Sequence, residues 1–348
     1  MRALVTGASG FVGSALCRRL AHEGHEVVAL MRTATRTARA GHAEVVEGSI
    51  AEPAQIARAA EGCDVIFHAA GIAAIDAPER VLRWVHVAGS ENVLRAARHA
   101  RVERVVHISC ADASLTSEDR MHWDEKRSLP TLPVGPHART KLVAEELMLA
   151  QSDDTLEVTA LRPALLWGPD DVDGISRLTR DVCSGAFTLY DGGRNIIAST
   201  HIDNLCNAAL LAATADDAPG RAYYVTDGEF LEAREFYTRL FSALGLAPLK
   251  LTGSRTAALL LARVRSVFSR AHQARVAQIL RAARSSLFDV SRAVADLGYE
   301  PKIDLDARMR ELSEWVQSAG GLDAILLRTR PAPTSADVDA QVRAAGGD

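Results

Sequence analysis

The sequence predicts an α/β protein built on a doubly wound parallel sheet, with a smaller, mainly helical domain toward the C-terminus. Three observations lead to this class. Short apolar segments alternate with helical patterns through the first half of the chain. A glycine-rich turn directly follows the first apolar segment, and the alternation stops after Arg162. Strands that alternate with helices form parallel sheets that are covered by helices on both faces.

Six segments of the first half have the character of buried strands. Most are apolar without a clean alternation of apolar and polar residues, which is typical of a parallel sheet covered on both faces. They lie at 2–6, 26–31, 43–47, 65–69, 104–109 and 157–162. Helical patterns lie between them at 13–22, 53–60, 78–99 and 137–151. Right-handed crossovers then place helices on both sides of the sheet.

The second half is less regular. A helix is expected near 176–184, a returning strand at 222–225, and mostly helix over 228–314. We expect a first domain of residues 1–166 with returning segments near 198–226. A second domain, mainly helical and substrate-binding, comprises 167–197 and 227–318. Residues 319–348 are rich in alanine and proline and are predicted to form a tail.

Residues 254–284 predict two amphipathic helices with arginine-rich outer faces. Two interpretations stay open for this pair. The helices are either ordinary surface helices of the second domain or a lid over a hydrophobic substrate.

Composition excludes several classes of protein. The 348 residues are 48% hydrophobic and 24% charged, which excludes wholesale disorder. A formal charge of −4 gives no reason to expect nucleic acid or an anionic membrane as a partner. No apolar run reaches the ~18–20 residues of a membrane span. A strand predicted from residue 2 leaves no room for a signal peptide, so a cytoplasmic protein is expected. The sequence does not indicate an oligomeric state.

The cysteines and histidines give no sign of a metal site. The five cysteines include no CxxC pair and no His/Cys cluster. We therefore expect neither a bound metal nor a disulfide framework.

Residues 6–13, TGASGFVG, form a glycine motif between a predicted strand and a predicted helix. Gly7 allows a tight turn, Gly10 lets the backbone approach a pyrophosphate, and Gly13 lets the helix pack on the strand. The N-terminus of that helix offers unpaired N–H groups to the phosphates. The motif predicts a Rossmann-like dinucleotide site, whose candidate binding residues are Gly7, Ser9, Gly10, Phe11, Val12 and Gly13.

The end of the second predicted strand bears on which dinucleotide binds. A carboxylate there would bind the ribose 2′-hydroxyl of NAD, but the segment LMRTATR at 30–36 contains none. Arg32 and Arg36 stand there instead, and a guanidinium suits a 2′-phosphate. The sequence therefore favours NADP(H) over NAD(H), with Arg32 as the selecting residue. The alternative is that both arginines are solvated loop residues.

Several further motifs occur in a fixed order along the chain: DVIFHAAG at 64–71, GSENVL at 89–94, LRP at 161–163, GP at 168–169, HIDN at 201–204 and DLGYEP at 296–301. Together with the glycine motif they resemble the extended short-chain dehydrogenases/reductases, close to the 3β-hydroxysteroid dehydrogenase and dihydroflavonol reductase branch. The resemblance runs from residue 1 to about residue 301.

The resemblance implies roles for further residues around the cofactor. Ala69, Ala70 and Gly71 would line the pyrophosphate and the nicotinamide ribose. Ser49 and Ile50 would lie beside the adenine, although the family has Asp where Ser49 stands. Pro163 and the backbone after it would hold the nicotinamide carboxamide, and Lys141 would bond the nicotinamide ribose.

The family's catalytic residues are only partly present. Its Tyr-x-x-x-Lys pair aligns with His137 and Lys141, its Ser aligns with Cys110, and its structural Asn aligns with His86. Losing a general acid costs about 10²–10⁴-fold in rate, and a thiol is a weak donor. Lys141, His137 and Cys110 are therefore the candidate catalytic residues of a site that departs from the family pattern.

Three interpretations of this departure stay open. The protein is a ketoreductase that needs no tyrosine, because a substrate hydroxyl next to the ketone supplies the proton. Otherwise His137 is a replacement acid, as in a steroid- or flavonol-type dehydrogenase. The third possibility is a non-catalytic NADP(H)-binding sensor or scaffold.

A degenerate triad together with a lid resembles the ketoreductases of aromatic polyketide antibiotic pathways. We therefore predict an NADPH-dependent ketoreductase for a polycyclic aromatic, angucyclinone-like polyketide, with that small molecule as its partner.

Overall fold

The computed structural model describes residues 1–33, 41–75, 77–247, 252–266 and 270–328. The side chains of residues 263–274 are outside this description. Arg36, the second arginine after the predicted second strand, lies outside the described residues, as does the link at 267–269 within the predicted helix pair.

Seven strands form one parallel sheet in the order β11-β7-β5-β4-β1-β2-β3. Their bounds are β1 Arg2–Thr6, β2 Glu26–Met31, β3 Glu44–Glu47, β4 Val65–His68, β5 Arg104–Ile108, β7 Glu157–Pro163 and β11 Ala222–Val225. The chain adds β2 and β3 on one side of β1 and then crosses to β4 on the other side. This reversal beside β1 is where open α/β sheets bind their ligands, outside the carboxyl ends of the strands.

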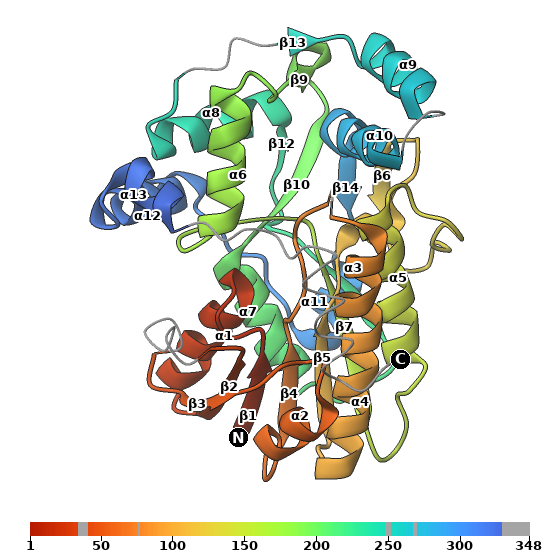
Figure 1. Ribbon diagram of the computed structural model, residues 1–348, viewed down its shortest axis with the longest axis vertical. Coiled ribbons are helices and arrows are strands. Elements are labelled where there is room, and N and C mark those ends of the chain that lie inside the picture. The colour runs from red at the N-terminus through yellow and green to blue at the C-terminus, as the bar shows by residue number, and fades with distance from the viewer. Residues whose placement is uncertain (34–40, 76, 248–251, 267–269, 329–348) are drawn as a thin grey trace.

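Helices cover both faces of the sheet (Figure 1). On one face α1 (Phe11–His22), α7 (Ile202–Ala212) and α11 (Ser291–Leu297) bury their apolar sides in one core. On the other, α2 (Pro53–Ala59), α4 (Gly89–Ala100) and α5 (Pro136–Leu149) contribute to a second core. The predicted Rossmann-like, doubly wound sheet is confirmed.

The predicted helix over 78–99 is divided. It consists of α3 (Glu79–Arg83), a π-helical turn η2 (Trp84–Ala88) and then α4. The π-turn carries His86 and lies against α5. Such turns are frequent at functional sites, and this one presents His86 to the start of α5.

The second group of elements lies beyond the carboxyl edge of the sheet. Helices α6 (Val172–Cys183), α8 (Ala233–Leu244) and α12 (Leu305–Ser318) enclose their own apolar core. Smaller sheets pair β8 (Leu165–Trp167) and β12 (Phe230–Glu232) with β10 (Ile196–His201), and β9 (Leu189–Tyr190) with β13 (Thr252–Gly253). A third pairs β6 (Arg120–Trp123) with β14 (Ser286–Phe288). Two 3₁₀ turns, η3 (Ala111–Ser114) and η4 (Asp191–Gly193), complete the irregular connections.

A buried carboxylate joins this group to the sheet. Asp227 accepts hydrogen bonds from Trp167 Nε1 at 3.0 Å, Ser199 Oγ at 2.7 Å, the His201 amide at 2.6 Å and Asn204 Nδ2 at 2.8 Å. A buried carboxylate that accepts four donors fixes the elements that carry them.

The two helices expected within 254–284 are present as α9 (Arg255–Ser266) and α10 (Arg270–Ala283). Figure 1 shows α10 above α5, at the carboxyl edge of the sheet. Its buried residues pack with Tyr190 and with Val134, which lies two residues before α5.

The prediction of a tail over 319–348 was wrong for its first part. Residues Gly321–Leu327 form helix α13, which contacts α6 and α12 and buries Ile325 completely. The proline content lies after this helix, in 329–348, outside the described residues.

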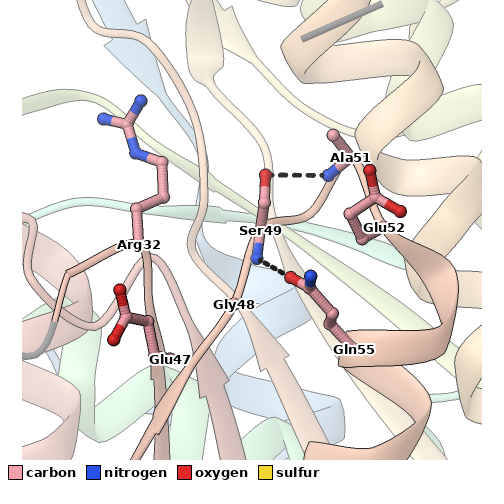
Figure 2. A pocket seen from close by; sticks show the side chains of 7 residues that line it. All are labelled: Arg32, Glu47, Gly48, Ser49, Ala51, Glu52 and Gln55. Atoms are coloured by element: carbon pink, nitrogen blue, oxygen red, sulfur yellow. Dashed lines mark hydrogen bonds between the residues drawn. The ribbon is translucent and has the colours of Figure 1, made fainter. Parts of the chain in front are cut away.

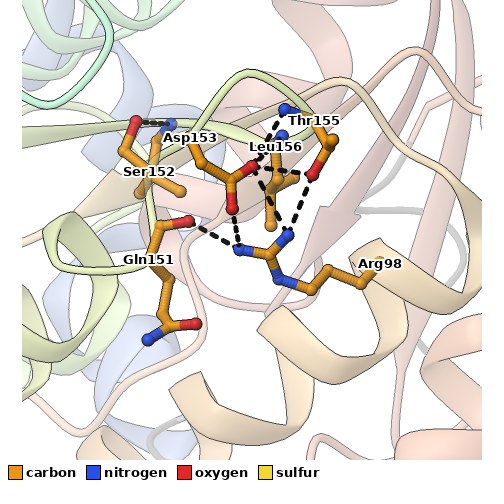
Figure 3. Close-up of polar contacts among 7 residues, drawn as sticks. Arg98, Gln151, Ser152, Asp153, Thr155 and Leu156 are labelled. Atoms are coloured by element: carbon orange, nitrogen blue, oxygen red, sulfur yellow. Dashed lines mark hydrogen bonds and ion pairs between the residues drawn. The ribbon is translucent and has the colours of Figure 1, made fainter.

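A polar cluster ties the end of α4 to the turn between α5 and β7 (Figure 3). The Arg98 guanidinium donates to Asp153 at 2.7 Å and to the Gln151 carbonyl at 2.9 Å. The Thr155 amide also donates to Asp153, at 2.9 Å. Arg98 holds the pKa of Asp153 below its usual value.

Within the described ranges, no helix is both long and apolar enough to cross a membrane. The same residues contain no group of three His, Cys, Asp or Glu side chains arranged to hold a metal ion.

Candidate active site

The glycine motif forms the turn between β1 and α1. Gly7 has a φ of +69°, and a Cβ on it would lie 2.7 Å from the Ala70 Cα. A Cβ on Gly13 would lie 2.2 Å from the Gly7 carbonyl oxygen. Helix α1 follows Gly10 without any side-chain cap. Its first amide groups therefore face the carboxyl edge of the sheet, where they can donate to a phosphate. Ser9, Phe11 and Val12 are partly buried around this turn.

A chain of buried hydrogen bonds fixes the segment after β4. The Thr6 hydroxyl oxygen accepts from the Ala70 amide at 3.3 Å and lies 2.8 Å from His68 Nδ1. His68 Nε2 lies 3.2 Å from the Ser90 hydroxyl, which donates to the His86 carbonyl at 2.6 Å. Because Ser90 donates onward, His68 Nε2 carries the proton and Nδ1 accepts from Thr6. Ala69, Ala70 and Gly71 are thus held beside the glycine turn.

A pocket of about 330 Å³ lies beyond the ends of β2 and β3 (Figure 2). Its lining comprises Arg32, Glu47, Gly48, Ser49, Ala51, Glu52 and Gln55. The Ser49 amide donates to Gln55 Oε1 at 2.9 Å, and the Ala51 amide donates to Ser49 Oγ at 3.2 Å. These bonds fix the loop that forms one wall of the pocket.

The structure places Ile50 against α4 and not in this lining. Its carbonyl accepts from Asn92 Nδ2 at 2.9 Å, and its Cδ1 would lie 2.7 Å from a Cβ on Gly89. Glu47, which the sequence reasoning missed, shares the pocket with Arg32. It was missed because it ends the third strand, whereas the search for a carboxylate covered only the end of the second. The pocket lining therefore contains one guanidinium, that of Arg32, and two carboxylates, those of Glu47 and Glu52.

Lys141 lies at the centre of the carboxyl edge. Its Nζ donates to the Ile108 carbonyl at 2.9 Å, and it would lie 3.4 Å from a Cβ on Gly71. Lys141 therefore spans the ends of β4 and β5, where the resemblance places the nicotinamide ribose. Burial lowers the pKa of this ammonium group.

His137 lies one turn before Lys141, in the first turn of α5. Burial, with Lys141 and then Arg281, lowers its pKa to about 3. Its ring meets His86 edge-on at 5.3 Å, and its buried Nδ1 has no hydrogen-bond partner among the described residues. A protonated His137 acid would have to hold its charge against burial and two cations. This geometry argues against the hypothesis of an imidazolium donor.

His86 holds the start of α5 in place. Its Nε2 accepts from the Ile72 amide at 3.1 Å, so Nδ1 carries the proton toward the Thr140 hydroxyl oxygen at 2.9 Å. Thr140 in turn donates to the Pro136 or His137 carbonyl. His86 thus joins the loop after β4 to the helix that carries His137 and Lys141.

Cys110 follows β5, where the resemblance predicts the family's serine. Its Sγ accepts from the Asp112 amide at 3.3 Å, and burial raises its pKa to about 11. The group is therefore a neutral thiol at neutral pH. The neighbouring Ser109 hydroxyl is buried and unpartnered within the described chain.

Pro163 ends β7 at the same edge and is buried. The first amide after it, that of Ala164, donates to Thr200 Oγ1 at 2.9 Å. This amide is therefore already engaged, whereas the resemblance expected this stretch of backbone to hold the carboxamide.

Three charged residues that the sequence analysis did not single out complete the site: Asp112, Arg120 and Arg281. Asp112 in η3 lies 3.0 Å from Arg281 Nε of α10 and 3.7 Å from Arg120 Nη1 of β6. Burial acts to raise the pKa of Asp112, but the two arginines bring it below its usual value. No sequence pattern joins these residues, because they come from three separate elements.

The glycine turn, the uncapped start of α1 and the pocket beyond β2 fit a pyridine dinucleotide. Its pyrophosphate would lie at α1, its adenosine near Ser49, and its nicotinamide ribose beside Lys141. The fit rests on the close approach of Gly7 to Ala70, which leaves no space for a side chain.

The comparisons with known proteins agree with this fold and site. A model of the NAD dependent epimerase/dehydratase family matches residues 3–226. A 4-hydroxy-2-methyl-3-oxo-4-farnesyl-3,4-dihydroquinoline-1-oxide ketoreductase of Stigmatella aurantiaca is 34% identical over 71% of this chain and 74% of its own. A 3 beta-hydroxysteroid dehydrogenase/Delta 5-->4-isomerase of Mycobacterium tuberculosis is 30% identical over 86% of each chain.

Among solved structures, that of MoeE5 in complex with UDP-glucose and NAD is similar, with a TM-score of 0.72. It is 26% identical, and the match covers 92% of this chain and all of that one. The family model, these relatives and the cofactor cradle agree: the chain belongs to the NAD dependent epimerase/dehydratase family, within the extended short-chain dehydrogenases/reductases.

Proposed function

We propose that this protein is an NADPH-dependent ketoreductase that reduces a polycyclic aromatic, angucyclinone-like polyketide in antibiotic biosynthesis. The observation that carries the proposal is a contrast within the site. The cofactor side keeps the glycine turn and Lys141, whereas the position of the acid holds a buried His137 with a pKa of about 3. Such a site suits a ketone whose proton comes from elsewhere.

The substrate is the proposed source of that proton. A hydroxyl that is hydrogen-bonded to the ketone, as in peri-hydroxy aromatic polyketides, supplies it as the carbonyl accepts a hydride. The relative from Stigmatella aurantiaca supports a ketone reduction, because its name describes a ketoreductase for an oxygenated ring system.

The chain's own residues bind and orient the reactants. The bound dinucleotide would supply the hydride. Lys141, held by the Ile108 carbonyl, fixes the ribose on that side. Cys110 and His137 are neutral and offer weak polar contacts, and the buried ring of His137 helps to keep bulk water away from the reacting carbonyl.

NADPH is the proposed cofactor because Arg32 lines the pocket beyond β2 and forms no ion pair within the described part of the chain. Glu47 in the same pocket suits the ribose hydroxyls of NADH. The guanidinium is the better partner for a 2′-phosphate, which carries charge that Glu47 would repel.

Helices α9 and α10 are proposed to cover the substrate. Helix α10 packs on the start of α5 through Ala277, which meets Gly135. A flat apolar substrate under these helices would be shielded from water.

The test is NADPH oxidation with a panel of peri-hydroxy polyketide ketones, their methyl ethers, and simple ketones. Turnover of the peri-hydroxy compounds alone is expected. Equal turnover of the methyl ethers would contradict the proposed proton source.

A non-catalytic NADP(H)-binding protein is the second candidate, favoured by the absence of tyrosine at position 137. It predicts tight NADPH binding without turnover of any ketone in the panel. A steroid- or flavonol-type dehydrogenase with His137 as acid is disfavoured, because that role needs a proton that His137 holds only near pH 3.

A further inference from the structure

An excess of positive charge surrounds the position of the family's serine. Three cationic side chains, Lys141, Arg120 and Arg281, lie around Cys110, and Asp112 is the carboxylate among them. The nearby Arg162 and Glu145 form a closed ion pair, with Nε–Oε2 at 3.0 Å. Asp112 is thus paired with two arginines, Arg120 and Arg281. The Lys141 ammonium group donates to the Ile108 carbonyl and not to a carboxylate.

Helix α10 carries one of these cations, Arg281. Ala277 and Arg281 are four residues apart and share one face of the helix. A Cβ on Gly135, two residues before His137, would lie 2.7 Å from the Ala277 Cβ. This contact seats the helix on the start of α5, and Arg281 then reaches Asp112 beside Cys110.

The ion pair between Arg281 and Asp112 differs from a fully buried ion pair, because the arginine is partly exposed. Its Nε lies 3.0 Å from Asp112 Oδ2, and no hydrogen bond from Nη1 or Nη2 is found within the described residues. The Arg281 side chain keeps 34% of its surface exposed, whereas Asp112 keeps 10%. The terminal nitrogens of a guanidinium can bind two oxygens of an anion.

We propose that Arg281 is a specificity-determining residue that binds an acidic oxygen next to the substrate's ketone. That oxygen belongs to a carboxylate, an enolate or a phenolate. The inference rests on the proposed function for the ketone, but it concerns a second feature of the substrate. It assigns α10 a charge-recognition role in addition to covering the site.

Asp112 competes for the same guanidinium. When an anion engages Arg281, Arg120 remains beside Asp112, so the buried carboxylate keeps a cationic partner. The site can therefore exchange one anion for another without leaving Asp112 unpaired.

The experiment measures binding to the protein saturated with NADP⁺. The probes are 1-hydroxy-2-naphthoate, which is an anion, and its neutral isostere 1-hydroxy-2-naphthamide, both followed by fluorescence. Arg281→Met is expected to weaken naphthoate binding at least about tenfold, the loss of one charge-assisted contact. Naphthamide binding should change less than about threefold. Arg281→Lys keeps the charge and should retain part of the preference.

Two further variants separate recognition from folding. Arg275→Ala removes an exposed charge from the same helix and should leave both affinities unchanged. Asp112→Asn removes the competing carboxylate and should tighten naphthoate binding, which a loosened site would not do. Equal loss of both probes in Arg281→Met, or no loss of either, would overturn the proposal.

The two proposals fail in different ways. If the wild-type protein reduces no ketone but binds naphthoate through Arg281, the proposed function is wrong and the anion site stands. If ketones are reduced and Arg281→Met keeps the wild-type preference for the anion, the reductase stands and Arg281 has no role in specificity.

Discussion

At the scale of single residues, Lys141 and His137 lie one helical turn apart in α5 and differ in their environment within the candidate site. Lys141 is held by a carbonyl at the end of β5, and His137 is a neutral ring without a partner for Nδ1 in the described structure. The resemblance predicts that the family's tyrosine would stand where His137 does. On that alignment the chain has, in place of a phenol, a group that stays neutral through the physiological pH range.

Replacing His137 tests whether it donates the proton. His137→Phe keeps an aromatic ring against His86 and should change kcat by less than about threefold. Loss of a true general acid costs about 10²–10⁴-fold. Turnover by stopped assays from pH 5 to 8 checks this, and a drop of a hundredfold, or loss of a pH-dependent limb, would show that the imidazole is the acid.

Replacing Lys141 tests the positioning of the cofactor. Lys141→Met removes the ammonium group proposed to bind the nicotinamide ribose and is expected to lower kcat/KM about 10²-fold, because small misplacements of reacting groups have effects of that size. Isothermal titration should show weaker NADPH binding. The exposed Lys126→Met is the matched control, and an unchanged kcat/KM in Lys141→Met would rule out the assigned role.

Two residues of the pocket in Figure 2 are expected to decide which cofactor binds: Arg32 favours NADPH, and Glu47 favours NADH. Arg32→Ala should weaken NADPH binding about tenfold or more and leave NADH binding nearly unchanged, since only the 2′-phosphate needs the guanidinium. Glu47→Gln should strengthen NADPH binding. Titration of both nucleotides on each variant provides the check, and equal effects on the two nucleotides would refute the selection by Arg32.

At the scale of elements, the turn between β1 and α1 depends on the absence of side chains. A Cβ on Gly13 would lie 2.2 Å from the Gly7 carbonyl oxygen, which is backbone and cannot move aside. Gly13→Ala should therefore displace α1 from β1, lower Tm by several degrees and abolish nucleotide binding. Gly24→Ala is a suitable comparison, because a Cβ there meets nothing within 4 Å, although its φ of +81° adds strain. Normal nucleotide affinity in Gly13→Ala would disprove the close packing of the turn.

Helices α5 and α10 show how an element carries residues into the site. Gly135, with a φ of +96°, begins α5 and leaves space for Ala277. The contact brings a helix from residues 270–283 onto a helix from residues 136–149. The sequence of either helix by itself does not indicate that the two helices pack together.

At the scale of the whole molecule, five buried histidines set a pH limit on stability. His68 and His137 have pKa values lowered to about 3, burial holds those of His86 and His107 well below 6.5, and burial also lowers that of His201. In the unfolded chain each imidazole gains a proton near pH 6.5. The unfolded state then binds more protons than the native state, so stability falls as pH drops from about 6.5 toward 3.

The expected slope is about 1.4 kcal/mol per pH unit for each histidine that stays neutral in the native state. Urea unfolding at pH 7.5, 6.0 and 5.0 measures it. His107→Leu removes a ring whose two nitrogens have no hydrogen-bond partner in the described chain. It should reduce the slope by the contribution of one histidine, about 1.4 kcal/mol per pH unit. Replacement of the exposed His99 serves as the control. A slope that is the same in wild type and His107→Leu would contradict the neutral burial of this ring.

The sequence alone determined the class of the sheet, which is parallel and doubly wound, and the glycine turn of the cofactor site. These features are local: a strand, a glycine turn and a helix follow one another within residues 2–22, and periodicity together with glycine spacing identifies them. The resemblance to the family grouped Lys141, His137 and Cys110 as the candidate catalytic residues.

Only the tertiary structure decided which charges surround those residues. Asp112, Arg120 and Arg281 come from three elements and meet through packing between α10 and α5, which no local pattern encodes. The tertiary structure also places Glu47 in the same pocket as Arg32. The low pKa of His137 likewise depends on tertiary structure, because burial, Lys141 and Arg281 cause it. Backbone geometry follows from neighbours along the chain, whereas electrostatic environment depends on neighbours in space.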